Sequence, residues 1–301
     1  MKTEINKKLF SWAILFVLML TWGSSFILMK RALEVYSFSQ VGSLRIFLAF
    51  ITAIPFAIKG IKKVSLKQWK YLFWVGLLGN GFPAFLFTKA QTGIDSSLAG
   101  ILNSLTALFT LVVGVYFFSL KTKWFNVAGV FIGLVGAIGL IYVSSDGNFE
   151  LNFKFSVYVI IATICYAISA NIVKTHLMEL NPVKITVYAL LTITLPASIY
   201  LFAFSGFFET FTTEQNSLQA LGYITILAVV GTTLALIAFN KLIQMTSSVF
   251  ASSVTYLIPI VALFWGIFDG ESFELYFLIW IFLTLFGVFL VNFKAKNKIK
   301  V

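Results

Sequence analysis

The sequence predicts an all-α integral membrane protein in which ten transmembrane helices form two inverted five-helix repeats. Three observations support this fold class: a strongly apolar composition, apolar runs of membrane-spanning length, and a weak internal repeat. Hydrophobic residues make up 59% of the 301 residues, whereas charged residues make up 11%. A water-soluble domain of this length needs more charged residues than this to cover its surface. A polytopic membrane protein is therefore the class that fits.

The first five spans are predicted where apolar runs approach the ~20 residues that cross a bilayer. They cover residues 9–29, 39–58, 70–88, 97–118 and 124–143. The run at 9–29 follows basic residues, as in a signal peptide, but it is too long for one and no small-x-small cleavage site follows it. We therefore expect it to be retained as a span. After the third run, the segment KAQTGIDSSLAG fits either a loop or a continuing helix.

The last five spans are predicted by the same criterion over residues 155–174, 184–205, 218–240, 247–268 and 275–293. The connections between runs are short, so no soluble domain is expected. The chain therefore divides into a first half at 9–143, a second half at 155–293, and a basic cytoplasmic tail at 294–301.

The distribution of basic residues predicts the orientation. With a cytoplasmic N-terminus, seventeen Lys residues fall on the inner side and four basic residues fall outside, whereas nine of the eleven acids fall outside. This bias predicts a multi-pass protein of the cell (inner) membrane with both termini in the cytoplasm. The basic loops would face an anionic leaflet, which accounts for the net charge of +11 without a nucleic-acid partner.

Two pairs of segments suggest an internal repeat. WGSSFILMKRAL (22–33) pairs with YAISANIVKTHL (166–177), and residues 87–114 pair with 239–266, each without a gap. Since each half holds an odd number of spans, the second half enters the membrane from the opposite side. Inverted repeats of this kind are typical of secondary transporters, which bind substrate near the midplane between the halves.

Several motifs resemble the EamA type of the drug/metabolite transporter superfamily. In the first half these are TWGSSFILMK and LRIFLA (44–49). In the second half it is AFNKLIQMTSSVFASSVTYLIPIVALFWGIFDGESF (238–273), with the helix proline Pro259 and the pair Gly270–Glu271. The resemblance covers nearly the whole chain. It implies a ten-helix transporter that exports or exchanges amino acids, metabolites or drugs without ATP.

The first half departs from the family pattern. Thr106 and Ala107 stand where a proline is expected, and no Glu lies near Leu120. The sequence therefore gives no reason to expect that the fourth span bends as the ninth does.

Polar side chains inside spans are candidates for a substrate cavity, because they are costly unless they face protein or water. Trp22 lies in the middle of its span, away from the interfacial belt where tryptophan is usual. Its repeat mate Tyr166 is also an aromatic residue with a polar atom. The full set of cavity candidates is Trp22, Ser25, Asn80, Asn103, Tyr166, Asn171 and Tyr256.

Each candidate also has a purely structural interpretation. Small residues such as Ser25 let helices approach closely, and amides often join neighbouring helices. Asn80 lies among glycines and a proline that would kink the third span by themselves. The sequence alone does not separate these roles from substrate binding.

Four further residues are predicted to act in gating or structure: Lys30, Arg45, Lys174 and Pro259. Lys30 and Lys174 are repeat mates at span ends, where they would offset the helix dipole or form gates at opposite mouths. Arg45 starts roughly 7–8 Å deep, at 1.5 Å per residue, which is within snorkelling reach. Since the family places an arginine there, we expect gating, structure or pairing with an outer acid such as Glu34, rather than substrate contact.

The sequence argues against other function classes. A single cysteine, Cys165, and a single histidine, His176, leave no intramolecular disulfide, no multi-cysteine metal or cluster site and no multi-histidine site, and no metal site is expected. No catalytic residues, phosphate-binding loop or cofactor motif are evident, so we do not expect an enzyme. No Asp or Glu lies clearly within a span, which favours uniport or exchange of a small molecule. An intramembrane enzyme and a channel are the alternatives, and no oligomeric state is indicated.

Overall fold

The computed structural model describes residues 2–57, 64–120, 123–143 and 149–292, and the regular elements in these ranges are all helical. The predicted basic tail at 294–301 and the loop lysines within 58–63 lie outside the described residues. The orientation expected from these charges therefore stays a prediction.

The first half begins with α1 (Lys2–Leu33) and α2 (Phe38–Ala57). The third span is interrupted: α3 (Leu66–Gly76) passes through a π-helical segment, η1 (Leu77–Gly81), into α4 (Phe82–Ala90). A capping box between Ser65 and Gln68 starts α3. The half ends with α5 (Ser96–Leu102), α6 (Leu105–Phe118) and α7 (Trp124–Val143).

The second half begins with α8 (Phe149–His176). Asn181 caps α9 (Pro182–Ile199), which continues as the π-helical η2 (Tyr200–Phe204), and a short α10 (Phe207–Thr213) follows. The eighth predicted span comprises α11 (Ser217–Ala228), the π-helical η3 (Val229–Leu234) and α12 (Ala235–Met245). The last elements are α13 (Ser248–Ser252), the 3-10 helix η4 (Ser253–Tyr256), α14 (Ile258–Phe268) and α15 (Phe277–Asn292).

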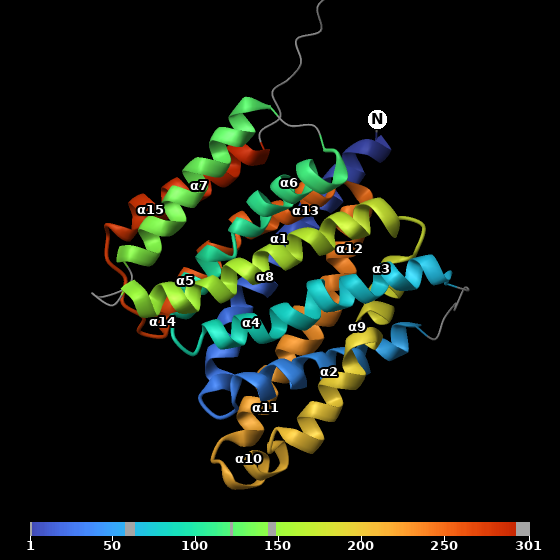
Figure 1. Cartoon of the computed structure of the whole chain (residues 1–301), viewed down its shortest axis with the longest axis vertical. Coiled ribbons are helices and arrows are strands. Elements are labelled where there is room, and N and C mark those ends of the chain that lie inside the picture. Colours follow the sequence, from blue (N-terminus) through green and yellow to red (C-terminus); the bar gives the residue numbers. More distant parts are fainter. Residues whose placement is uncertain (1, 58–63, 121–122, 144–148, 293–301) are drawn as a thin grey trace, which may run out of the picture.

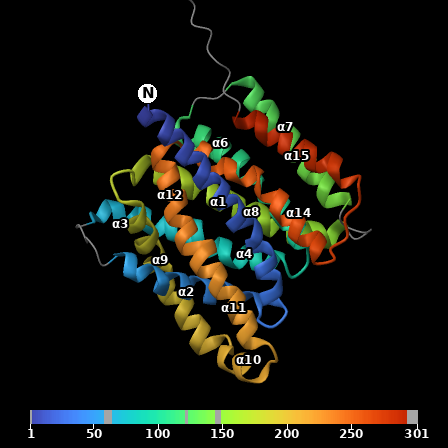
Figure 2. The ribbon, with the colours of Figure 1, turned by 180° about the vertical axis from the view of Figure 1, so that it is seen from behind.

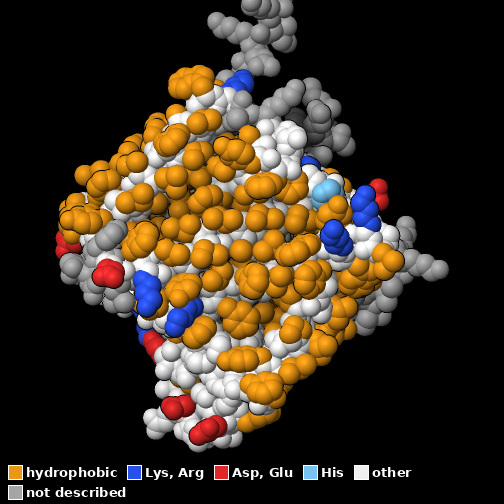
Figure 3. Space-filling view, in the orientation of Figure 1, with side chains coloured by type: hydrophobic (Ala, Val, Ile, Leu, Met, Phe, Trp, Pro, Cys, Tyr) orange, Lys and Arg blue, Asp and Glu red, His pale blue; other side chains and the backbone are white. Residues whose placement is uncertain are grey.

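Nine helices in the described part of the chain are long and apolar enough to cross a membrane. The tenth predicted span, at 275–293, coincides with α15, whose apolar stretch Phe277–Leu290 is shorter than the other nine. Figure 3 shows a broad field of hydrophobic side chains across one face, with charged side chains gathered toward its margins. These features establish a multi-pass membrane protein.

The helices α1 and α8 lie on opposite faces of the bundle, with α8 at the front in Figure 1 and α1 at the front in Figure 2. α1 contacts α14, α11 and α12, whereas α8 contacts α6, α4 and α3. α7 and α15 lie side by side at one edge. There the backbones approach so closely that a Cβ atom on Gly287 would lie 2.2 Å from the Gly133 nitrogen. Such glycine contacts drive helix packing in a bilayer.

The fourth span is broken at a position that matches the break in the ninth span, although the sequence provided no reason to assume a bend there. α5 ends at Leu102 and α6 begins at Leu105, so Asn103 and Ser104 interrupt the helix. Asn103 accepts a hydrogen bond from the Thr106 hydroxyl (3.2 Å), and Ser104 O accepts one from Thr255 (3.3 Å). Side-chain hydrogen bonds of this kind compete with helical ones, so no proline is needed.

The structure also shows the conformation of the segment KAQTGIDSSLAG and the position of Pro259. α4 ends at Ala90 and α5 begins at Ser96, so KAQTGIDSSLAG contains a loop rather than a continuous helix. Pro259 lies in the first turn of α14, where its missing N–H costs no helical hydrogen bond.

Candidate substrate cavity

A cavity lies at the centre of the helix bundle, between α1, η1, α8, η3, α12 and the broken fourth and ninth spans. It has a volume of about 970 Å³, its open mouth included. Most of the exposed area of the wall is apolar or aromatic, although nearly half of the lining residues carry a polar side chain. This combination is typical of small-molecule sites.

Aromatic rings line the middle of the cavity. Trp22 meets Phe239 edge to face at 5.1 Å between ring centroids, and Tyr166 stacks on Phe87 at 5.8 Å. The Trp22 indole N–H donates to the carbonyl of Gly231 (2.9 Å), which belongs to the π-helical η3. A π turn disturbs the regular pairing of helix carbonyls, so a side-chain donor fits there.

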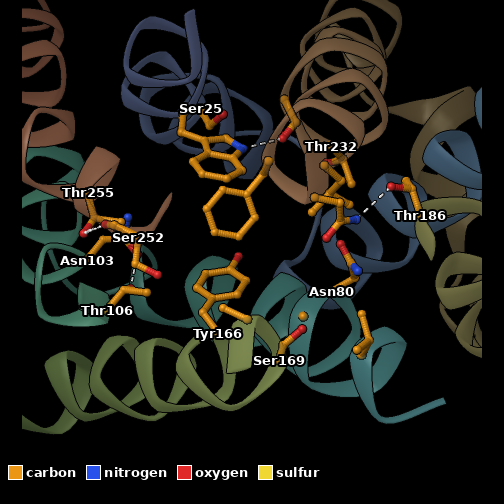
Figure 4. Close-up of a pocket in the computed structure, with 18 of the residues that line it drawn as sticks. Ser25, Asn80, Asn103, Thr106, Tyr166, Ser169, Thr186, Thr232, Ser252 and Thr255 are labelled. Carbon is orange, nitrogen blue, oxygen red and sulfur yellow. Dashed lines mark hydrogen bonds between the residues drawn. The ribbon is translucent and has the colours of Figure 1, made fainter. Parts of the chain in front are cut away.

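Polar side chains form two groups on either side of Tyr166 (Figure 4). The first group lies at the two broken spans and is called the broken-helix cluster here. The second group lies around η1 and η3 and is called the π-helix cluster. The broken-helix cluster comprises Asn103, Thr106, Ser252 and Thr255, and the π-helix cluster comprises Asn80, Ser169, Thr186, Thr232 and Asn240.

The π-helix cluster is held by hydrogen bonds among its own members and the backbone. Asn240 Nδ2 donates to Thr186 Oγ1 (3.0 Å), and Thr232 Oγ1 donates to Leu227 O (3.0 Å). Glycines in the two π-helical segments make the close packing possible, since a Cβ on Gly79 would lie 2.5 Å from Ser169 Oγ. A Cβ on Gly231 would likewise lie 2.9 Å from Ser25 Oγ.

Arg45 lines the cavity, although the sequence favoured gating or structure over a place in the substrate path. Its Nε donates to Thr232 Oγ1 (2.9 Å), and Nη1 reaches the weak acceptor Met29 Sδ at 4.0 Å. Its side chain also interacts with the Tyr166 hydroxyl. Glu34, a partner considered for Arg45, pairs instead with Arg31 (2.7 Å).

Lys30 belongs to a network of ions at the end of the bundle predicted to face outward. Its ammonium contacts Asp269 (2.6 Å) and Glu271 (2.8 Å), whose side chains are 7% and 3% exposed, and Arg31 also pairs with Asp269. Glu271 in addition accepts hydrogen bonds from the backbone N–H and hydroxyl of Ser96 and from the N–H of Ser97. The network thus joins the end of α1, the start of α5 and the loop after α14.

The pKa of the Glu271 carboxyl is strongly shifted. Burial alone would raise its pKa, but the hydrogen bonds from Lys30, Ser96 and Ser97 outweigh that effect and lower the pKa to about 2. The carboxylate is therefore charged at neutral pH, and it pairs with the Lys30 ammonium.

Lys174, the repeat mate of Lys30, lies at the opposite end of the bundle and makes different contacts. Its ammonium donates to the carbonyls of Ile243 (3.0 Å) and Thr246 (2.7 Å) at the C-terminal end of α12. A cation is favourable at that position because the helix dipole is negative there.

The cavity brings together five of the seven predicted lining residues: Trp22, Ser25, Asn80, Asn103 and Tyr166. Asn171 and Tyr256 lie elsewhere. Asn171 Nδ2 donates to Thr110 O and Ala167 O (both 3.0 Å), and its Oδ1 accepts from Ser248 (2.9 Å), so it joins helices. The Tyr256 hydroxyl is buried with no hydrogen-bond partner among the described residues.

The sequence did not single out several lining residues, although the repeat contained a signal for some of them. Thr232 follows Asn80 by the same 152 residues that separate Phe239 from Phe87, and all four line the cavity. Extending the second repeat alignment by a few residues would have identified Thr232. No comparable signal marked Thr186 or Ser252.

Comparison with known proteins supports a transporter. The model of the EamA-like transporter family matches residues 10–142 and 154–293. An uncharacterized transporter of Archaeoglobus fulgidus is 24% identical and covers 93% of this chain and 98% of its own. The uncharacterized inner membrane transporter YedA of Escherichia coli K12 is 27% identical over 84% of this chain and 80% of its own.

Two further similarities are more limited, the first in the length that it covers and the second in sequence identity. A probable amino-acid metabolite efflux pump of Salmonella typhimurium is 29% identical over 44% of this chain and 43% of its own. A solved crystal structure of a protein aligns with a TM-score of 0.67 at 14% identity, covering 94% of this chain and 96% of that chain. At this identity the structural likeness supports the fold alone.

Proposed function

Because the chain belongs to the EamA-like transporter family and is a multi-pass membrane transporter, we propose that it is a secondary transporter working by alternating access. It exports or exchanges a small metabolite, amino acid or drug without ATP, and the substrate binds in the central cavity. The observation that carries this proposal is that residues at matching positions of the two halves line one cavity within the bundle.

The positions of the helix irregularities support two five-helix repeats of opposite orientation. The π-helical segments η1 and η3 begin at Leu77 and Val229, which are 152 residues apart. That offset is the one at which Phe87 and Phe239 align. The broken fourth span likewise has its counterpart in the ninth span, where η4 interrupts the helix. If α15 is counted as the last span, the protein has ten transmembrane helices.

Helix contacts also repeat between the halves. α1 packs on α14 of the second half, and its counterpart α8 packs on α6 of the first half. α1 contacts α11 and α12 as α8 contacts α3 and α4. Two similar halves that face opposite ways can exchange conformations, and each exchange opens the site to the other side.

The ion network at Lys30 supports assignment of this structure to a state closed at the outer end. The cavity lining extends in the other direction to Val173, Thr186 and Ile243, near the ends of α8, α9 and α12 that are predicted to be cytoplasmic. Both termini then lie in the cytoplasm of a cell whose inner membrane holds the protein, with the basic loops against the anionic leaflet.

An intramembrane enzyme is the second candidate, but no observation favours it. His176 stacks on Tyr71 at 3.9 Å between ring centroids, and neither His176 nor Cys165 lines the cavity. The described residues thus place no nucleophile with a base at the site, as covalent catalysis would need. A channel differs from the proposal in flux that does not saturate.

Counterflow in proteoliposomes tests the proposed function. Vesicles preloaded with one unlabelled compound from a panel of amino acids, organic acids and amphipathic drugs would receive trace labelled compound outside. We expect saturable accumulation of label driven by exchange, without ATP or an ion gradient, for at least one compound. Non-saturating flux or chemical conversion of the compounds would contradict a carrier.

A further inference from the structure

We propose that the substrate is a monoanionic carboxylate with an apolar body, and that Arg45 binds the carboxylate. This inference names the substrate class of the cavity and therefore rests on the proposed function. Among the described residues that line the cavity, Arg45 is the one with a formal charge at neutral pH, and the rest are apolar or neutral polar.

The guanidinium of Arg45 has hydrogen-bonding capacity to spare. It carries five N–H donors, of which the Nε donor is used by Thr232 and one donor on Nη1 meets only a thioether sulfur. Tyr166, whose hydroxyl points toward the middle of the cavity in Figure 4, is a further neighbour. The remaining donors form a planar fork that matches the two oxygens of a carboxylate.

Arg45 also has no carboxylate of the protein within ion-pair distance among the described residues. Three acids at the end of the bundle predicted to face outward pair with other cations: Glu34 with Arg31, and Asp269 and Glu271 with Lys30. An unpaired cation within a membrane is costly, and such residues commonly serve as counter-ions for a ligand. A carboxylate on the substrate supplies the missing charge.

The rest of the wall indicates what the carboxylate is attached to. Trp22, Phe87 and Phe239 present aromatic surface to the cavity, with Met29 beside Arg45. An aromatic or branched apolar body would bury its surface against these side chains. A cationic amine would meet no lining carboxylate and would lie close to the positive charge of Arg45, so amines are disfavoured.

Three ligands with one phenyl body and different charges test the proposal on purified wild-type protein. They are 3-phenylpropionate (an anion at pH 7), phenylalanine (a zwitterion) and phenethylamine (a cation), with affinities measured by isothermal titration calorimetry. We expect 3-phenylpropionate to bind most tightly and phenethylamine most weakly. Equal or stronger binding of the amine, or binding of none of the three, would overturn the proposal without any variant.

The variant Arg45→Gln then tests the residue. Its affinity for 3-phenylpropionate should fall about 10- to 100-fold, as expected for loss of a hydrogen-bonded charge. Its affinity for phenethylamine should stay equal or rise, which shows that the cavity is intact. Arg45→Lys keeps the charge but loses the fork, so an intermediate affinity is expected. An equal loss for all three ligands would assign Arg45 a structural role and overturn the inference.

The inference and the proposed function fail differently. Counterflow of phenethylamine, without counterflow of 3-phenylpropionate, would uphold a transporter and overturn the carboxylate site. Tight, Arg45-dependent binding of 3-phenylpropionate without any counterflow would uphold the site and contradict transport.

Discussion

Trp22 connects α1 to the irregular part of the eighth span through one hydrogen bond, from its indole N–H to Gly231 O. Replacing it by phenylalanine keeps an aromatic ring and removes the donor. We expect Trp22→Phe to lower the free energy of unfolding by about 1 kcal/mol, because the Gly231 carbonyl loses its partner, and to slow counterflow. Thermal unfolding in detergent and a flux assay measure the two effects.

A matched control is Trp124→Phe, since Trp124 is 80% exposed on the surface that would face lipid or its headgroups. This change should leave both unfolding and flux near the wild-type values. Similar effects of the two variants would show that the contact at Gly231 has no special role.

Glu271 gives the outer ion network a defined pH dependence. Its pKa in the folded protein is about 2, below the ordinary value of 4.5. The stabilisation it contributes is therefore fully present above about pH 4.5 and is lost as the pH falls toward 2. We expect Glu271→Gln to lower the melting temperature at pH 7 and to weaken the loss of stability between pH 4.5 and 2.

The exposed Glu209 on α10 provides the comparison. Glu209→Gln should change neither the melting temperature at pH 7 nor its dependence on pH. If Glu271→Gln retained the acid transition of the wild type in full, the charged network at Lys30 would not be the source of that stability.

The sequence predicts some of these residues better than others, for a physical reason. Trp22 and Tyr166 could be predicted because an aromatic residue at mid-span has few other uses. Asn171 could not be separated from them, because an amide in a span can bond another helix equally well. Its partners come from α6 and α8 backbones and from Ser248, and only the fold brings these together. The depth expected for Arg45 stays a prediction, and its direction into the cavity depends on how α2 packs.

At the scale of elements, the close packing of η3 against α1 depends on the small residues at their contact. A Cβ on Gly231 would lie 2.9 Å from Ser25 Oγ, and this hydroxyl is itself held by Thr21 O (2.9 Å). We expect Gly231→Ala to destabilise the protein by about 1–3 kcal/mol through overpacking. Adding Ser25→Ala should recover part of the loss, which a double-mutant cycle of unfolding free energies would measure.

Gly222 on α11 offers a control within the same predicted span. No atom lies within 4 Å of a Cβ built there, so Gly222→Ala should be neutral or slightly stabilising, since alanine favours the helix. Additive effects of Gly231→Ala and Ser25→Ala would contradict the close contact between α1 and η3.

Helix positions could be predicted from apolar runs, whereas helix interruptions could only partly be predicted. Gly79, Gly81 and Pro83 pointed to an irregular third span, and η1 lies there. The break at Asn103 was missed because it uses side-chain hydrogen bonds instead of a proline. The same chemistry places Asn103 in the cavity, so the departure from the family pattern did not remove this bend.

At the scale of the whole molecule, the proposed mechanism requires the two ends of the bundle to open alternately. The end predicted to face outward is held by the ion pairs of Lys30 with Asp269 and Glu271, whereas at the other end the Lys174 ammonium donates to the carbonyls of Ile243 and Thr246. Weakening the outer network should therefore shift the protein toward a state open to the outside. This shift can be measured without knowing the substrate.

Distances between spin labels test this alternation most directly. In a Cys165→Ser background, one pair (Thr92→Cys with Tyr276→Cys) reports on the outer end. A second pair (Gln244→Cys with Trp124→Cys), at the same 152-residue offset, reports on the inner end. With Glu271→Gln added, we predict that the population of long outer distances and that of short inner distances rise together. Simultaneous lengthening at both ends, or no change at the inner end, would contradict alternating access between the two halves.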